Sequence, residues 1–446
     1  MGHLIDVHHR ELDTGRIVRG AFGNMKVFKF GGASVKNADA IKNAVKITLS
    51  FKSPLVVVVS AIGKTTNALE KLWEAYVAED DLAVQQNLEH LYLFHLNIIQ
   101  ELGTATDACL RLFKESFEQL GTYLEKDPSD HMAYEYDQIV SFGELWSTII
   151  FAEELKVNSV RAKWLDARKI IRTSNRYQEA RVDWEKTKEL VLKTISFEFA
   201  KDLQLKCVVT QGFIGHTDTG MTTTLGREGS DFSAAILAWA LEAEEVFIWK
   251  DVPGLLNADP KEFKNPQKID QISYKEAIEL SYFGASVIHP KTLKPLQNKN
   301  IPLKIKSFLN PDSEGTIIHF DESKDFNQPS YIYKTNQLLI TISPKDFSFI
   351  MEDHISEIFT VFSSMGVKVH LMQNSALNFS VCADIKRTML QPLIDELSKM
   401  FLVRYNEDVD LFTIRHYENH IFPEKLKSKT ILIQQRSRST IRYVLR

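Results

Sequence analysis

Three stretches of the sequence combine polar or charged side chains with glycines, a combination suited to holding phosphate groups. In the first, Lys29 ends a short apolar run and is followed by Gly31 and Gly32. Two residues without side chains let phosphates approach the backbone, and the lysine can neutralise the charge of a transferring group. Taken alone, a lysine at a strand end before a Gly-Gly turn is more often structural.

The second and densest stretch, Thr222–Asp231, lies directly before a helical pattern over 232–241. The first turn of a helix presents free amides and a partial positive charge, both of which favour an anion. Arg227 adds a planar guanidinium that can bind a carboxylate through two hydrogen bonds. Ser230 or Asp231 could simply be the N-cap of the helix. Because a cap explains one of these residues and not the whole run, we favour a binding site.

The third stretch, Gly63–Thr65, matches the end of a phosphate-binding P-loop, but Val58 stands where the opening glycine of that motif belongs. We therefore exclude a P-loop of this kind. The loop still follows an apolar run through Ser60, and its amides could face a phosphate or a carboxylate. An ordinary strand-to-helix turn is the alternative.

Short apolar strands that alternate with helical patterns must position these residues. Strands are expected over 26–30, 55–60, 160–164, 206–210, 246–249 and 301–305, and helices over 37–49 and, in a long excursion, 67–124. Continuously apolar strands separated by helices are typical of a parallel sheet covered on both faces. The prediction for residues 25–320 is therefore a three-layer αβα domain on a mainly parallel sheet of at least six strands.

The polar segment 321–334 predicts a linker, after which the order of elements changes. The expected order βαββαβ of a ferredoxin-like unit comes from strands over 337–343, 367–372, 377–383 and 401–405 and helices over 352–365 and 386–400. Residues 407–446 predict an incomplete second unit, with strands over 409–416, 430–435 and 439–445 and a weak helix around 423–427. Residues 1–24 lack the apolar core of a secretory signal, and we expect an arm outside the fold.

Composition narrows the class of protein further. The formal net charge is −4 with both signs scattered along the chain, which argues against a nucleic-acid partner. The three cysteines, Cys109, Cys207 and Cys382, are far apart and fit a reducing compartment. The longest apolar run, 54–62, is about half of the ~20 residues that cross a bilayer. We therefore expect a cytoplasmic protein without a membrane anchor.

The stretches Lys29–Val35 and Thr222–Asp231 resemble signatures of the aspartate kinases, members of the amino-acid kinase family. Further stretches agree in order, namely Ser141–Ser147, Trp249–Gly254 with Asp259–Lys261, and Phe283–Pro290. The βαββαβ unit, 335–406, is similar to the ACT regulatory modules of these kinases, with 407–446 as an incomplete copy. The resemblance implies that Mg-ATP phosphorylates the β-carboxylate of L-aspartate to 4-phospho-L-aspartate, the entry to lysine, threonine and methionine synthesis.

The resemblance also implies a role for individual residues. Lys29 would contact the transferring phosphoryl group, with Asp231 holding that lysine in place. Glu144 would bind the α-ammonium of aspartate and Arg227 its α-carboxylate, with Thr66 and Ser230 also at the substrate. Outside its motif, Glu144 would be interpreted as an exposed helix charge. The residues expected at ATP are Lys29, Gly31, Gly32, Ser60, Lys250, Asp251, Leu256 and Lys261. Mg²⁺ would enter on the ATP oxygens, without a metal site in the protein.

The resemblance has two departures. Ser286 stands where many relatives carry a lysine near the adenosine. His370 and Ala376 stand where lysine-sensing relatives carry acidic side chains, which argues against lysine as the effector. We nevertheless expect an amino-acid effector at the ACT region, and a homodimer or higher homo-oligomer through residues beyond about 330.

Two other functions remain open at the level of sequence. Another amino-acid kinase, for instance one acting on N-acetylglutamate, would offer Glu144 no cation because its substrate nitrogen is acylated. A non-catalytic amino-acid sensor would keep the ACT module with a degenerate kinase domain. The presence of Lys29, Glu144, Arg227 and Asp231 argues against the sensor.

Overall fold

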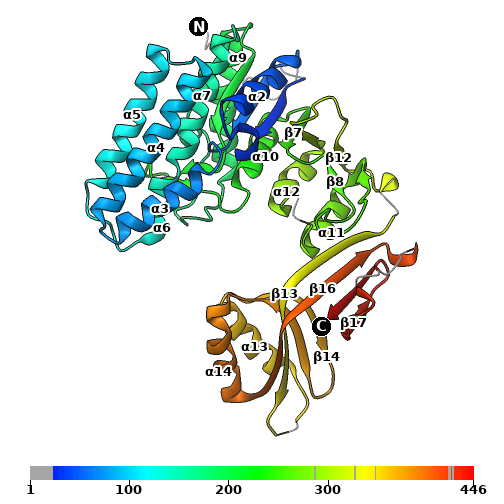
Figure 1. Cartoon of the computed structure of the whole chain (residues 1–446). Coiled ribbons are helices and arrows are strands. Elements are labelled where there is room, and N and C mark those ends of the chain that lie inside the picture. The colour runs from blue at the N-terminus through cyan, green and yellow to red at the C-terminus, as the bar shows by residue number, and fades with distance from the viewer. Residues whose placement is uncertain (1–23, 286–287, 326–327, 347, 420–422, 424–425) are drawn as a thin grey trace, which may run out of the picture. The chain divides into compact units, whose positions relative to one another are not determined.

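The computed structural model describes residues 24–285, 288–325, 328–346, 348–419, 423 and 426–446 (Figure 1). Apart from Asn24, the predicted arm lies outside the described residues. The chain forms two compact units. The first unit contains the described residues up to Leu255 with Asp270–Tyr274 and Ile288–Lys324, and the second contains those of Leu256–Ile269, Lys275–Val287 and Asp325–Arg446.

An eight-stranded sheet organises the first unit, in the order β10-β12-β11-β7-β1-β2-β4-β3. Its strands are β1 (Lys26–Phe30), β2 (Leu55–Val59), β3 (Ala162–Leu165), β4 (Cys207–Gln211), β7 (Glu245–Lys250), β10 (Gln271–Ser273), β11 (Leu303–Ser307) and β12 (Thr316–His319). Neighbouring strands are parallel except β11 and β12. The predicted αβα fold with a mainly parallel sheet is confirmed. The central strand β2 is apolar and buried throughout, as expected of a strand covered on both faces.

Helices fill the connections of the first unit. The excursion predicted over 67–124 consists of α3 (Thr65–Val77), α4 (Asp81–Leu102) and α5 (Asp107–Leu124), and Figure 1 shows these helices together with α7 on one flank. The other helices are α2 (Ala38–Ser50), α6 (Met132–Val140), α7 (Phe142–Val157), α8 (Trp184–Val191), α9 (Phe197–Lys201), α10 (Gly229–Leu241) and α12 (Pro290–Lys299). Short turns η1 (Gly32–Val35), η2 (Ala167–Lys169), η3 (Leu192–Ser196) and η4 (Glu322–Lys324) and the hairpin β5 (Ile214–His216) with β6 (Thr222–Thr224) complete the unit.

Strand alternation decides which side of the sheet Lys29 faces. Successive side chains of a strand point to opposite faces. Phe30 packs on Phe151 of α7, with ring centroids 5.8 Å apart, whereas Lys29 contacts Asp231 of α10. One apolar face of β1 therefore anchors the strand on α7 and leaves the lysine on the α10 side.

The second unit contains a six-stranded antiparallel sheet, in the order β14-β15-β13-β16-β18-β17. Its elements are β13 (Ser330–Pro344), α13 (Glu352–Ser364), β14 (Lys368–Asn374), β15 (Phe379–Asp384), η5 (Arg387–Met389), α14 (Leu390–Met400), β16 (Phe401–Arg415), η6 (Tyr417–Asn419), β17 (Ile431–Arg436) and β18 (Thr440–Leu445). The predicted order βαββαβ is present, and α13 and α14 lie side by side against the sheet (Figure 1). The second unit also contains α11 (Tyr274–Phe283), except its first residue. It contains the strand pair β8 (Leu255–Leu256) and β9 (Lys268–Ile269) as well, except Leu255.

Two strand predictions in this unit need correction. β13 begins at Ser330, so the last residues of the predicted linker are extended. The strands expected over 401–405 and 409–416 are one strand, β16, because β13 pairs with it on both sides of a register shift. The predicted weak helix around 423–427 lies largely outside the described residues.

The carboxyl ends of four adjacent strands position the residues that the sequence singled out. Strands β7, β1, β2 and β4 are neighbours and run in the same direction. The Ser60 amide donates to Phe30 O at 3.0 Å, and the Gly212 amide donates to Val59 O at 3.2 Å. The segments that leave these strands therefore meet at one edge of the sheet, where open α/β sheets bind their ligands.

None of the helices in the described part of the chain is long and apolar enough to cross a membrane. The cytoplasmic location stays a prediction.

Candidate active site

A cleft of about 850 Å³ opens at this edge of the sheet in the first unit. Segments far apart in the sequence line it: the ends of β1, β2 and β7, helices α3 and α7, and the first turn of α10. The predicted site residues among its lining are Lys29, Gly32, Ser60, Thr66, Glu144, Arg227, Ser230, Asp231 and Lys250. The structure thus brings the expected phosphate-binding and amino-acid-binding side chains into one cleft.

A buried carboxylate holds two lysines at the floor of this cleft. The Lys29 ammonium nitrogen lies 2.7 Å from one oxygen of Asp231, and that of Lys250 lies 3.4 Å from the other. Burial would raise the pKa of Asp231, but the two ammonium groups outweigh it and hold this pKa below its usual value. Asp231 is therefore an anion that fixes two cations, and the pair can neutralise phosphate oxygens.

The start of α10 explains why Asp231 is available for this role. Glu228 occupies the N-cap position with a left-handed φ of 55°, and its side chain makes no capping hydrogen bond. The helix begins at Gly229, so Ser230 and Asp231 lie inside its first turn, and the alternative that either is the N-cap is wrong. Ser230 packs closely on Gly212, where a Cβ would lie 2.5 Å from the Ser230 Cβ. The first turn of α10 therefore approaches the end of β4 closely.

Glu144 is a buried carboxyl without a counter-charge in contact. Glu144 lies in the first turn of α7 and is 3 % exposed. The alternative interpretation of Glu144 as an exposed helix charge is therefore wrong. The Ala61 amide donates to its Oε1 at 3.4 Å, and Oε2 has no hydrogen-bond partner among the described residues. Burial raises the pKa of Glu144 to about 8. A buried acceptor left unsatisfied at a cleft is suited to a cationic group of a ligand.

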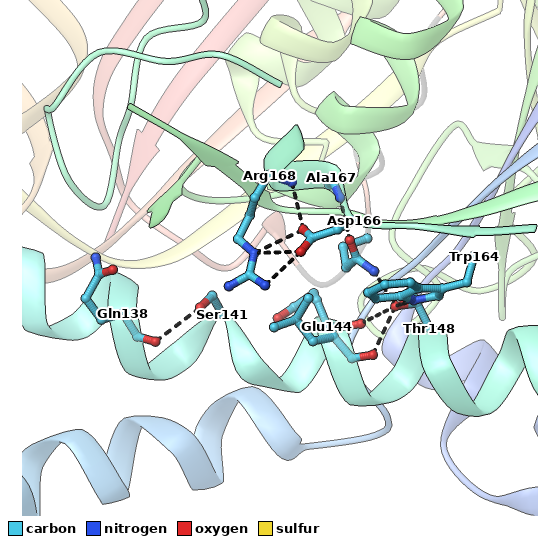
Figure 2. A network of polar contacts seen from close by, with 10 residues as sticks. Gln138, Ser141, Glu144, Thr148, Trp164, Asp166, Ala167 and Arg168 are labelled. Carbon is cyan, nitrogen blue, oxygen red and sulfur yellow. Dashed lines mark hydrogen bonds and ion pairs between the residues drawn. The ribbon is translucent and has the colours of Figure 1, made fainter. Parts of the chain in front are cut away.

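A network of polar side chains fixes the turn of α7 that carries Glu144. Figure 2 shows Thr148 donating to the Glu144 carbonyl and accepting from the Trp164 indole, each at 2.9 Å. The Gln211 side chain joins the same Thr148 hydroxyl to the Ala167 amide, so β3 and β4 are both tied to α7. Ser147 adds a hydrogen bond to Ser60 O at 2.6 Å. These bonds hold Glu144 relative to the loop after β2.

Arg227 is the cationic side chain of the cleft that could bind the carboxylate of a ligand. Its side chain is exposed, lines the cleft and forms no ion pair with any described residue. A guanidinium without an internal partner retains its full fork of donors for a ligand carboxylate.

The sequence analysis missed several residues of the cleft, among them Glu70, Tyr136, Gln178, Glu179 and Phe213. Glu70 lies one helical turn after Thr66 on α3, so its i, i+4 spacing could have revealed it. Tyr136 donates to Glu70 at 2.8 Å. Gln178 and Glu179 belong to an irregular segment that carries no periodic signal.

Asp137 was also missed, although it does not line the cleft. Its buried carboxylate accepts from the Gln178 amide at 3.0 Å and from the Thr224 amide at 2.8 Å and hydroxyl at 2.7 Å. It therefore joins two segments of the cleft wall, one from the irregular loop and one from β6.

Four predicted ATP-binding residues do not line the cleft. Gly31 packs close to Lys29, since a Cβ at Gly31 would lie 3.0 Å from the lysine nitrogen. Asp251 follows the last residue of β7 and is exposed. Leu256 and Lys261 belong to the second unit. The roles of all four stay predictions, and Ser286 lies outside the described residues.

The chain is similar to known proteins over most of its length. Residues 24–307 match the amino acid kinase family. The chain is 32 % identical over 398 residues to the lysine-sensitive aspartokinase 3 of Escherichia coli (strain K12), covering 87 % of this chain and 86 % of that protein. It is also 32 % identical over 381 residues to the chloroplastic aspartokinase 1 of Arabidopsis thaliana, covering 83 % of this chain and 65 % of that protein.

Solved structures of one relative have a similar fold. The structure of E. coli aspartokinase III with lysine and aspartate has a TM-score of 0.79 at 29 % identity, covering 94 % of this chain and 95 % of that chain. The complex of the same enzyme with aspartate and ADP has a TM-score of 0.78 at 29 % identity, covering 95 % and 96 %.

The close backbone approach at Gly32 yields a prediction. A Cβ there would lie 2.8 Å from Gly63 O and 3.1 Å from Ala61 O, so the loop after β2 would have to move. We expect Gly32→Ala to weaken ATP binding by about tenfold or more, roughly 1.4 kcal/mol, measured by isothermal titration calorimetry.

Gly121→Ala is the matched control, because a Cβ at this helical position of α5 meets no atom within 4 Å. It should leave ATP binding unchanged and stabilise the helix by about 0.5–1 kcal/mol. Tryptophan fluorescence monitors folding in both variants, since all six tryptophans belong to the first unit. A folded Gly32→Ala protein with unchanged affinity for ATP would contradict the close approach of phosphates.

Proposed function

The chain belongs to the aspartokinases of the amino acid kinase family and is an aspartate kinase, and from this premise we propose how its residues carry out phosphoryl transfer. The donor in this proposal is ATP with its bound Mg²⁺. The observation that carries the proposal is the meeting of the Lys29–Asp231–Lys250 cluster with Glu144 and Arg227 in one cleft.

Lys29 and Lys250 bind the phosphate side of the reaction in this proposal. Phosphoryl transfer needs little covalent help from the protein, so positioning and charge neutralisation dominate. Asp231 keeps both ammonium groups in place before the nucleotide arrives, which avoids reorganisation during the reaction. Gly32 and Ser60 line the same wall and can approach the phosphates with backbone amides or a hydroxyl. Mg²⁺ prefers phosphate and water oxygens and supplies further neutralisation on the nucleotide.

Glu144 and Arg227 orient aspartate. The free carboxyl of Glu144 takes the α-ammonium, and the unpaired guanidinium of Arg227 takes the α-carboxylate. With both α-groups held, the β-carboxylate is the nucleophile left to face Lys29. One of its oxygens forms the new bond to the γ-phosphorus while the bond to the β,γ-bridging oxygen breaks, and ADP leaves.

The unsatisfied Oε2 of Glu144 favours a substrate with a free amine over an N-acylated one. An amide nitrogen carries no positive charge and cannot compensate a buried carboxylate. This observation disfavours N-acetylglutamate as the substrate.

Single substitutions should separate the two halves of the cleft. We expect Lys29→Ala to lower kcat by about a hundredfold or more, because it removes a group aimed at developing charge. Arg227→Ala should chiefly raise KM for aspartate by about tenfold to a hundredfold, in line with ~1.5–3 kcal/mol for a hydrogen bond to a charged group. Both are measured by coupled ADP release.

Lys64→Ala is the control for this experiment, since Lys64 is an exposed lysine of the loop after β2 that does not line the cleft. Its kinetics should match those of the unaltered protein. Turnover of N-acetyl-L-glutamate or L-glutamate without turnover of L-aspartate would contradict the assignment of the substrate.

The raised pKa of Glu144 predicts how aspartate binding depends on pH. In the empty cleft Glu144 is protonated below about pH 8, and it must ionise to bind an ammonium group. Binding therefore releases a proton, and the affinity for aspartate should rise by up to about tenfold per pH unit between pH 6 and 8 and then level off.

Titration calorimetry at several pH values, in buffers of different ionisation enthalpy, measures both the affinity and the released proton. In Glu144→Gln the affinity should be weaker at pH 8 and independent of pH over this range. A dependence on pH that persists in Glu144→Gln would assign the titrating group elsewhere.

We also propose that the second unit forms a homodimer. Its described surface exposes large apolar side chains: Phe349, Met351, Met372, Leu377, Met400, Leu402, Ile431 and Leu432.

Light scattering should give twice the mass of one 51.1 kDa chain, and the double variant Met372→Glu with Leu402→Glu should reduce it to that of a monomer. Leu203→Glu, at an exposed leucine of the first unit, is the control and should stay dimeric. A double variant that keeps the dimer mass would refute this interface.

The C-terminal region senses an amino acid in this proposal, as the lysine-sensitive relative suggests by its name. His370 does not replace an acidic ligand for a lysine side chain, because burial, with Lys334 nearby, lowers its pKa to about 4 and leaves it neutral. Lysine is therefore disfavoured, and a rise in melting temperature with lysine but not with threonine or methionine would contradict this.

A further inference from the structure

A second cavity, of about 400 Å³, lies within the second unit. Helix α11 contributes Glu279 and Phe283 to it, and β16 contributes Arg415. The hairpin of β17 and β18 supplies the rest of the lining: Gln435, Ser437, Ser439, Thr440 and Arg442. No residue of this cavity takes part in the proposed catalytic cleft.

Arg415 is compensated by two carboxylates and also donates to two neighbouring hydroxyls. Its guanidinium forms ion pairs with Glu276 and, at 3.1 Å, with Glu279. Its Nη1 also donates to the Thr440 hydroxyl at 3.0 Å and to the Ser439 hydroxyl at 3.4 Å. A hydroxyl that accepts from Arg415 still has its own hydrogen to donate, and neither hydroxyl donates to a described residue. Two donors at this cavity therefore lack an acceptor.

Arg442 is a buried guanidinium without a counter-ion. It is 8 % exposed and forms no ion pair with a carboxylate of the described residues. Its Nε donates to the Thr413 hydroxyl at 3.3 Å and its Nη1 to His370 O at 2.6 Å, while Nη2 has no partner in the described chain. The guanidinium carbon lies 5.1 Å from the centroid of the Phe283 ring, a contact that orients it.

A further cation, Lys334, lies close to Arg442. Lys334 is close enough to Arg442 that the guanidinium contributes to a lowered pKa of this lysine, after burial. Asp384 acts on Lys334 and His370, and Glu276 and Glu279 pair with Arg415, but none of these carboxylates forms an ion pair with Arg442. A buried cation without a partner is unfavourable, and an anion in the cavity would relieve this.

We propose that this cavity binds the oxyanion group of a small ligand, a carboxylate or a phosphate, through the Arg442 guanidinium and the hydroxyls of Ser439 and Thr440. These are the groups whose hydrogens lack acceptors, and they line the same space. Glu279, whose side chain is 44 % exposed at the rim, disfavours a polyanion and offers a contact to a ligand that also carries an ammonium group. The volume admits a ligand the size of a small amino acid.

The site contains residues from inside and from outside the segment that matches the kinase family. Helix α11 belongs to the segment that matches the kinase family, whereas β16 and β18 follow that segment. The first residue of α11, Tyr274, belongs to the first unit. A ligand held between α11 and β18 therefore stabilises the packing of a helix whose chain leads directly into the catalytic unit.

Calorimetric titration of the full-length protein tests the proposal in a buffer free of phosphate and carboxylates. The probes are inorganic phosphate, propionate and L-alanine, and the last two share a carbon skeleton but differ in the ammonium group. Because phosphate can also enter the catalytic cleft, each titration is repeated in Lys29→Ala, which removes a phosphate-binding cation of that cleft and should leave this second site unchanged. Hydrogen exchange locates the bound probe, since protection is expected in peptides from α11 and β18.

We expect at least one probe to bind with Kd below about 1 mM and to lose about tenfold or more in affinity in Arg442→Gln and in Ser439→Ala. Ser439 is only partly buried, so its variant decides the outcome if Arg442→Gln does not fold. Arg404→Gln, at an exposed arginine of β16 outside the cavity, is the matched control and should bind normally. Phosphate binding alone identifies a phosphate site, and tighter binding of L-alanine than of propionate identifies a zwitterion held also by Glu279.

Two results would overturn the proposal. One is that no probe binds more tightly than about 1 mM. The other is that binding persists undiminished in Ser439→Ala and in a folded Arg442→Gln, or that protection appears outside α11 and β18. A failure of catalysis in Lys29→Ala has no bearing on either result, so this site and the catalytic proposal are tested separately.

Discussion

The buried carboxylate of Asp231 is the constraint on which the rest of the active-site geometry depends. A carboxylate that is 2 % exposed remains ionised only if cations compensate it, and Lys29 and Lys250 provide this compensation. The same contact fixes both lysines, which come from different strands, at the floor of the cleft. It also requires the first turn of α10 to lie against the ends of β1 and β7. A single ion-pair cluster thus couples the position of a helix to the placement of two phosphate-binding groups.

The sheet makes this coupling possible because its central strands are parallel and in register. Lys29 lies opposite Ile248 in β7 and Val58 in β2, so the residues that follow each strand emerge at the same edge. The alternation of β1 places Phe28 and Phe30 on the α7 side and Lys29 on the α10 side. Apolar packing on one face therefore holds the strand that presents a charged group on the other.

The sequence allowed the strands and the main charged residues to be predicted, because continuous apolar runs and glycine motifs have local signals. Helix α10 was expected to begin after Asp231, yet it begins at Gly229, since the left-handed conformation of Glu228 has no signature in a non-glycine residue. The pairing of Lys250 with Asp231 was not predicted, because it depends on which strands are neighbours. Gln178 and Glu179 lie in an irregular segment, and Asp137 secures them through hydrogen bonds that no spacing reveals. The single long strand β16 was divided in two because its polar middle resembles a turn.

Glu144 and Arg442 illustrate one physical principle with opposite signs. Glu144 is a buried carboxyl with a free oxygen, and Arg442 is a largely buried guanidinium whose Nη2 makes no hydrogen bond to a described residue, each at a cavity within its own unit. Folding leaves both groups with incomplete hydrogen bonding. Thr148, held by Trp164 and Gln211, binds the backbone carbonyl of Glu144 and not its carboxyl group. Thr413 and the Phe283 ring hold the guanidinium of Arg442 without compensating its charge. The network around Glu144 holds the backbone of its helix turn and leaves the carboxyl oxygen Oε2 without a partner among the described residues. The fold therefore orients this carboxyl group, and a ligand can compensate its charge. The contacts of Arg442 differ in that they are made by the guanidinium itself, through Nε, Nη1 and the Phe283 ring, and Nη2 makes no hydrogen bond to a described residue. Glu144 is therefore suited to bind an ammonium group, and Arg442 is suited to bind an oxyanion.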